Sequence, residues 1–151
     1  MPGTASYFYQ RVARLGYVAP ISQGAGTVTM TAIDLRYFDR LNATVMVGVI
    51  GSSATVDFKF QGCATSGGSY ADIDATNCAI PQITASGKIA TLELMAQAVV
   101  GRGFRYIKGI LVVGVAATLV GVLIEGVDAR YEPANQYDLA SVISNTVYIA
   151  P

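Results

Sequence analysis

Apolar and polar residues alternate along much of the chain between positions 26 and 125, and this pattern is typical of β-strands with one buried face. The clearest case is residues 54–61 (ATVDFKFQ). Its inward side chains would be Ala54, Val56, Phe58 and Phe60, and its outward ones Thr55, Asp57, Lys59 and Gln61. We therefore expect Phe58 and Phe60 to lie in the core.

Other segments predict further strands. Residues 27–32 alternate, and the nearly continuous β-branched run 41–50 indicates a strand buried on both sides. A glycine-rich turn at 66–69 precedes a short return strand at 70–73. Two more strands are expected at 103–113, with a kink at Gly109, and at 118–125.

Residues 88–97 (KIATLELMAQ) permit two interpretations. Leu, Glu, Met, Ala and Gln all favour helices. Ala90, Leu92 and Leu94 nevertheless alternate with Thr91 and Glu93, and the surrounding segments are strands. We therefore predict a strand here, with a helix as the competing interpretation.

These segments together predict an all-β chain. Seven or eight short strands with turn signals roughly every ten residues are typical of an antiparallel β-sandwich or jelly roll. We assign this domain to residues 26–125, with an extended N-terminal arm at 1–25 and an extended C-terminal segment at 126–151.

The two terminal segments are rich in aromatic residues, whereas disordered arms are usually poor in them. Two interpretations follow: the arms dock on another protein chain, or they pack back on their own domain. We predict docking, because an extended arm would otherwise leave its aromatic side chains exposed. The predicted partner-binding residues are Tyr7, Phe8, Tyr9, Arg11, Arg14, Tyr17, Arg130, Tyr131 and Tyr137.

Composition narrows the choice of partners. Only 13% of the residues are charged and 52% are hydrophobic, against about 25% charged in an average globular protein. The formal net charge is zero, which favours neither nucleic acid nor an anionic membrane as partner. The longest apolar run, 109–124, contains three glycines and is shorter than a membrane helix requires, so we predict two buried strands joined by a turn.

Residues for catalysis are scarce. The chain has no His, the commonest general base and metal ligand, so a Ser-His-Asp or Cys-His arrangement cannot be assembled from it alone. Asp72 and Asp74 form the closest carboxylate pair, but a calcium site needs more oxygen ligands at set spacing. We therefore expect no enzyme activity, no cofactor and no metal.

Two cysteines, Cys63 and Cys78, flank one polar loop. They could join across a hairpin as a disulfide, which would stabilise the fold by about 3 kcal/mol through loop closure. Two half-buried free thiols are the alternative, and both interpretations stay open. Their spacing does not match a zinc site.

Four segments resemble small proteins of tailed-phage heads: 56–61 (VDFKFQ), 66–73 (SGGSYADI), 104–108 (FRYIK) and 127–133 (VDARYEP). The chain from Val56 onward is similar in this respect to phage capsid cement (decoration) proteins. Sugar-binding sandwich modules share the first two segments. The segment at 127–133, which follows the last predicted strand, is therefore more specific to phage proteins.

The resemblance implies a jelly-roll protein on the outside of a phage capsid, assembled in the host cytoplasm. Its implied partners are the major capsid protein and further copies of itself, as a homodimer or homotrimer, with no nucleic acid and no membrane. Two alternatives remain: a small carbohydrate-binding sandwich, although the chain has no Trp, and a tail or head–tail connector subunit.

Overall fold

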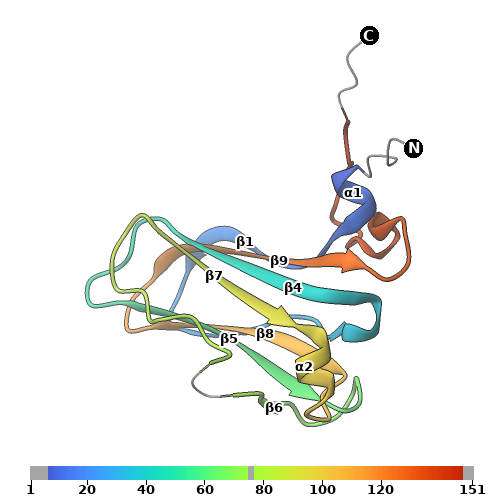
Figure 1. Ribbon diagram of the computed structural model, residues 1–151. Helices are drawn as coiled ribbons and strands as arrows, with labels where there is room; N and C mark the ends of the chain where they lie inside the picture. The colour runs from blue at the N-terminus through green and yellow to red at the C-terminus, as the bar shows by residue number, and fades with distance from the viewer. Residues whose placement is uncertain (1–6, 75–76, 148–151) are drawn as a thin grey trace.

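The computed structural model describes residues 7–74 and 77–147. Two antiparallel β-sheets pack face to face, which confirms the predicted all-β sandwich (Figure 1). The chain passes repeatedly from one sheet to the other, giving the strand orders β1-β9-β4-β7 and β2-β8-β5-β6. This connectivity is that of a jelly roll.

The first sheet contains the longest strands. Its members, in spatial order, are β1 (Val12–Gln23), β9 (Thr118–Ala129), β4 (Phe38–Val47) and β7 (Lys88–Met95). The second sheet contains β2 (Gly26–Thr29), β8 (Tyr106–Gly114), β5 (Thr55–Cys63) and β6 (Ala71–Asp72), and β3 (Ile33–Asp34) also pairs with β8.

Four short helical turns connect or flank the strands. They are α1 (Phe8–Arg11), α2 (Ala96–Val100) and the 3-10 turns η1 (Leu35–Tyr37) and η2 (Ala134–Tyr137). In the first turn of η1, the Asp34 carboxylate accepts a hydrogen bond from the Arg36 amide. Such a cap satisfies an amide that the turn itself leaves without a partner.

The core lies between the sheets, where the alternating strands meet. Phe58 and Phe60 are each 1% exposed, and their rings meet edge to face with centroids 5.3 Å apart. The register predicted for residues 54–61 is therefore confirmed. Gly109 brings β8 close to this cluster, because a Cβ there would lie 2.7 Å from the Met30 sulfur. β8 keeps its register with β5 through Gly109, so this pairing contains no bulge at the position of the predicted kink, and the glycine makes room for core side chains.

Two strand predictions can be compared directly with the structure. Residues 88–95 form β7, with Leu92 and Leu94 buried, and the helix signals act only at its end, where α2 begins. The strand predicted at 41–50 is present as β4, but the prediction that it is buried on both sides is wrong. Its residues alternate between buried and partly exposed positions. Its β-branched run reflects a central strand paired along both edges, with β7 and β9.

The apolar run 109–124 contains parts of β8 and β9, which lie in opposite sheets. The predicted pair of buried strands is confirmed, and the intervening turn carries the chain across the sandwich. Within the described residues, no helix is long and apolar enough to cross a membrane.

The predicted domain boundaries are wrong at both ends. Residues 12–23 of the presumed N-terminal arm form β1, which pairs with β9 along most of its length, and β9 itself continues to Ala129. Among the described residues, 7–11 precede the first sandwich strand. Cys63 and Cys78 are both free and buried, so the structure has the two-thiol alternative.

Candidate protein-binding surface

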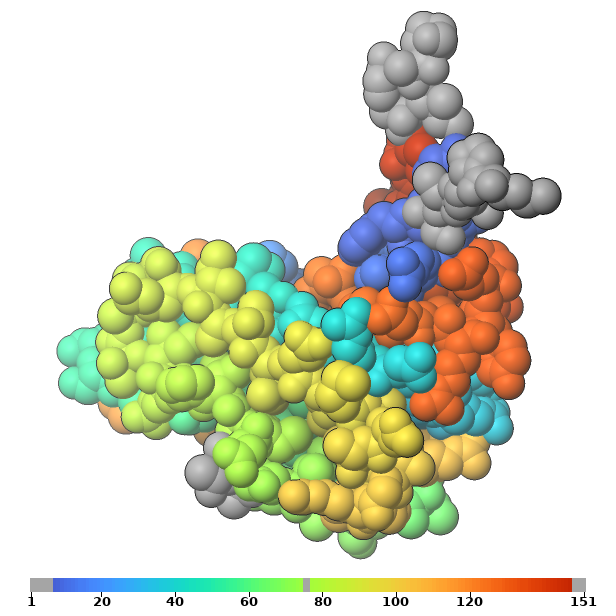
Figure 2. All heavy atoms as spheres, in the orientation of Figure 1, coloured from blue at the N-terminus to red at the C-terminus, as the bar shows by residue number. Residues whose placement is uncertain are grey.

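Both described chain ends leave the sandwich at the same corner of the first sheet and rise away from the second sheet (Figures 1 and 2). We call residues 7–11 and 143–147 the terminal projection. The two segments lie together, because a hollow between them is lined by Tyr7, Phe8, Tyr9, Arg14 and residues 144–147. The structure thus brings five of the predicted partner-binding residues, Tyr7, Phe8, Tyr9, Arg11 and Arg14, into one place.

The terminal projection exposes large apolar side chains. Phe8 is 61% exposed and Ile143 99% exposed, although both are residues that proteins usually bury. Tyr7 stacks on Tyr9 with ring centroids 5.7 Å apart. The projection therefore offers a partner a preformed aromatic surface.

Arg14 joins the two segments of the projection to β1. Its guanidinium donates a 2.6 Å hydrogen bond to the Asn145 side-chain oxygen and lies 5.4 Å from the centroid of the Phe8 ring. Glu125, its neighbour on β9, lies 4.0 Å away. Arg14 thus holds the projection together, and its role as a direct partner contact stays a prediction.

Arg11 has a similar role at the base of the projection. It donates a 2.7 Å hydrogen bond to Asp128, which also accepts from Arg40. The hydrogen bond from Arg40 and the charges of Arg40 and Arg11 together outweigh desolvation and lower the pKa of Asp128. The result is a small ion-pair network between α1, β4 and β9.

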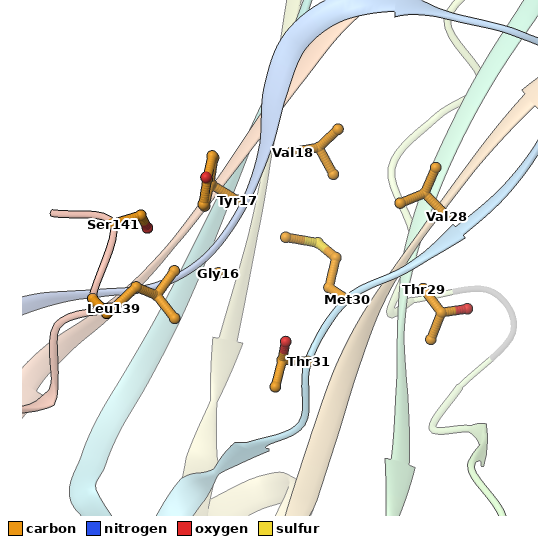
Figure 3. A pocket seen from close by; sticks show the side chains of 10 residues that line it. Gly16, Tyr17, Val18, Val28, Thr29, Met30, Thr31, Leu139 and Ser141 are labelled. Atoms are coloured by element: carbon orange, nitrogen blue, oxygen red, sulfur yellow. The ribbon is translucent and has the colours of Figure 1, made fainter.

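Tyr17 projects from β1 opposite Leu123 and is 51% exposed. It borders a second hollow, where the edges of the two sheets meet (Figure 3). Gly16, Tyr17 and Val18 lie on one side of it and Val28 to Thr31 on the other, with Leu139 and Ser141 at its end, and none of the residues that line it is charged. This hollow can offer apolar contacts and hydroxyl groups.

The remaining three predicted residues lie after β9. The Tyr137 ring stacks on Tyr37 with centroids 4.7 Å apart and meets Phe38 edge to face with centroids 5.6 Å apart. It therefore packs on its own domain. Arg130 forms a 2.8 Å ion pair with Asp39 on the surface. Tyr131 is 61% exposed and stays available.

The sequence interpretation missed an apolar groove on the outer face of the first sheet, at the end away from the termini. It is lined chiefly by Pro20, Met46, Ile89, Leu119 and Gly121. Ile89 is 70% exposed, and it lies beside Met46 on the neighbouring strand. The signal was present in the pattern: both residues occupy outward positions of alternating strands, where a solvated face would carry polar residues.

The carboxylates singled out for chemistry are engaged in local contacts. Asp72 pairs with Lys59 at 2.8 Å, and the hydrogen bond from Lys59 is the main reason that its pKa is lowered. Asp74 accepts hydrogen bonds from Asn77 and lies 3.6 Å from Arg102. Over residues 7–74 and 77–147, no three His, Cys, Asp or Glu side chains gather as a metal site would require.

No protein-family model matches the chain. A search of curated proteins finds no match either.

Proposed function

We propose that this chain is a non-enzymatic structural protein of a tailed-phage virion, which attaches to the outside of the capsid and cements neighbouring major capsid protein subunits. One observation carries the proposal: exposed apolar and aromatic side chains gather on the terminal projection, at one corner of the first sheet (Figure 2). Exposed apolar patches on a soluble domain mark sites of protein contact.

The charged residues around this surface support the same interpretation. Arg11, Arg14 and Arg130 each have an acidic neighbour within the chain, at 2.7 Å, 4.0 Å and 2.8 Å. They are thus engaged internally, and the contact surface that remains is apolar. Aromatic side chains supply much of the binding energy at the centre of protein interfaces. The choice of a phage capsid as the partner comes from the resemblance of residues 56–61 and 127–133 to cement proteins.

Co-sedimentation tests the proposal. The protein is mixed with empty shells of the major capsid protein encoded beside it and pelleted, with shells of an unrelated phage as control. We expect saturable binding to the cognate shells only, and resistance of the decorated shells to heat should increase. If the protein stays in the supernatant with both kinds of shell, the proposed function is wrong.

Two variants locate the contact. Phe8→Ser removes an exposed side chain of the projection, and we expect it to weaken attachment at least tenfold. Thr27→Lys changes an exposed position on β2, in the other sheet, and should bind as the unmodified protein does. Equal binding by both variants would place the contact elsewhere.

A further inference from the structure

Two exposed apolar surfaces of this chain lie on the same side of the first sheet but at opposite ends (Figure 1). β9 passes the apolar groove near its start, at Leu119, and the base of the terminal projection near its end, at Asp128. Between Leu119 and Asp128 the strand advances roughly 30 Å at about 3.4 Å per residue. The groove and the base of the projection therefore lie at opposite ends of the strand.

We propose that the chain forms a two-fold symmetric dimer in which the terminal projection of each copy lies in the apolar groove of the other. The proposal rests on the proposed function in one respect: it assigns the terminal projection to a second copy, so that Phe8 supports attachment to the shell by joining two copies. It commits to a second copy as that partner, and contact of the projection with the capsid protein is an outcome that the test can reveal.

Symmetry favours this arrangement. If two copies face each other across an axis that lies parallel to the sheets and perpendicular to the strands, the projection end of one copy faces the groove end of the other. The projection rises from the outer face of the first sheet (Figure 1). Met46 and Ile89, which line the groove, are exposed on the same face, so the projection of one copy faces the groove of the other. Because the separation of projection and groove is the same in both copies, one rotation forms both contacts, as a two-fold interface requires.

The outer face of the first sheet carries uncharged residues in its middle, where the two-fold axis of the dimer would pass. Across the four strands, the outward residues there are Tyr17, Leu123, Thr44 and Thr91, which are uncharged. Tyr17 is 51% exposed and would meet its own counterpart near the axis. Self-contact of uncharged residues involves no repulsion between like charges.

The groove and the projection are chemically matched. The groove presents Ile89 at 70% exposure and Met46 at 43%, over a floor that includes Gly121. The projection presents Phe8 and Ile143, which are 61% and 99% exposed. Flexible Met side chains adapt to aromatic rings, and sulfur–aromatic contacts add to the apolar burial.

Charges between the two surfaces do not oppose the contact. Asp128 is paired with Arg11 and Arg40, and Glu93 lies 3.2 Å from Arg40. A second copy would therefore cover existing ion pairs at the projection end, while Lys88, which also lines the groove and is exposed, must keep its ammonium group in solvent, because lone buried charges are the costly case.

The sheet face supplies most of the area that a stable dimer needs. A stable interface buries about 800 Å² on each partner. Four strands about 4.8 Å apart and some nine residues long present a face of roughly 600 Å² in plan. The projection adds its own aromatic surface to this, so the total approaches the area that a stable dimer needs.

Sedimentation velocity of the isolated protein tests the dimer without any capsid. We expect a dimer, and we expect Ile89→Lys in the groove and Phe8→Lys in the projection each to raise its dissociation constant by at least about tenfold. Thr27→Lys on the second sheet is the matched control and should stay dimeric. A monomer, a trimer or a larger assembly of the unmodified protein would overturn the inference.

Cross-linking tests the reciprocal geometry. A Phe8→Cys variant and an Ile89→Cys variant are treated with a short bismaleimide, alone and as a mixture, beside the unmodified protein, whose two cysteines are buried. Covalent dimers should form in the mixture and not with either variant alone, since like positions lie at opposite ends. Self-linking of the Ile89→Cys variant would mean that two grooves pack together, which contradicts the proposal.

The shell assay separates this inference from the proposed function. A monomeric protein that still binds shells through Phe8 would make the capsid protein the partner of the projection, and only the inference would fail. A reciprocal dimer that binds no shell would leave the inference standing while the proposed function fails.

Discussion

The backbone amide of Leu139 donates a 2.9 Å hydrogen bond to the carbonyl oxygen of Arg14. Arg14 lies in β1, the edge strand of the first sheet, and Leu139 lies in the segment that follows the last 3-10 turn. The returning chain thus pairs with an edge that would otherwise present open hydrogen-bonding groups, and open edges promote aggregation. The same contact places the C-terminal segment beside α1, which creates the terminal projection.

Asp138 is the side chain that secures this return. It accepts a 2.6 Å hydrogen bond from the Arg14 amide and a 2.9 Å hydrogen bond from the Asn145 side chain. We expect Asp138→Ala to lower the free energy of unfolding by about 1–2 kcal/mol, because a partly buried amide loses its charged acceptor. Hydrogen exchange should become faster at residues 139–147.

A matched control is Asp39→Ala, which removes the exposed partner of Arg130. Exposed ion pairs contribute about 0–1 kcal/mol, so stability should hardly change. If exchange at residues 139–147 were equally slow in the Asp138 and Asp39 variants, Asp138 would not be the anchor of the segment.

The two faces of β5 predict a sharp contrast in stability. Phe58→Ala should lower the free energy of unfolding by roughly 3–5 kcal/mol, because it leaves a cavity beside Phe60 and Met30 in the core. Lys59→Ala removes only the surface pair with Asp72 and should cost less than about 1 kcal/mol. Chemical denaturation of both variants measures the difference, and similar losses would contradict the assigned register.

Stability should fall at acid pH because of Asp128. Its pKa in the folded chain is lowered, mainly by the hydrogen bond from Arg40, whereas an unfolded Asp titrates near about 3.9. The carboxylate therefore stabilises the fold above about pH 4, and this contribution disappears as the pH falls through the lowered folded pKa. Thermal melts at stepped pH should show Asp128→Asn less stable than the unmodified protein at pH 7. The two curves should converge toward pH 2, and a constant gap would exclude Asp128 as the titrating group.

Much of the sandwich could be predicted from the sequence, because strands with one buried face record their register in the alternation of side chains. Phe58 and Phe60 are the plainest case, and Leu92 and Leu94 outweigh the helix propensity of their neighbours. At these positions the alternation in the sequence and the burial in the folded protein agree, so the sequence alone predicts the strand that the structure contains.

The chain ends could not be predicted in this way. β1 contains Gly16 and Pro20 and shows two register shifts against β9, which interrupt the alternation that would reveal a strand. Tyr137 resembles a docking residue in the sequence, yet its ring packs on Tyr37 and Phe38, which are remote along the chain. The apolar groove likewise depends on which strands are neighbours: Met46 lies between Ile89 and Gly121 only once the sheet is assembled.

The cysteines should react slowly in the folded protein. Both thiols are buried, and burial raises the pKa of Cys78, which reduces the fraction present as reactive thiolate. We expect a thiol reagent at pH 8 to label the protein much faster in denaturant than in buffer. Electrophoresis with and without reductant should give the same mobility, and a shift would show that a disulfide forms.

Added salt distinguishes apolar contacts from electrostatic ones. We expect 1 M NaCl neither to dissociate the dimer nor to release the protein from the shell. Raising the salt from 0.1 M to 1 M shortens the Debye length from about 10 Å to about 3 Å and so weakens contacts between charges. Burial of apolar surface contributes about 25 cal/mol per Å² and does not weaken in this way. The exposed side chains of the projection are mainly Tyr7, Phe8 and Ile143, while Arg11 and Arg14 have acidic neighbours within the chain. Both the dimer and the shell-bound protein should therefore sediment unchanged in 1 M NaCl. Release at high salt would instead assign the contact to charged side chains, and Arg11→Ala would then have to weaken binding more than Phe8→Ser does.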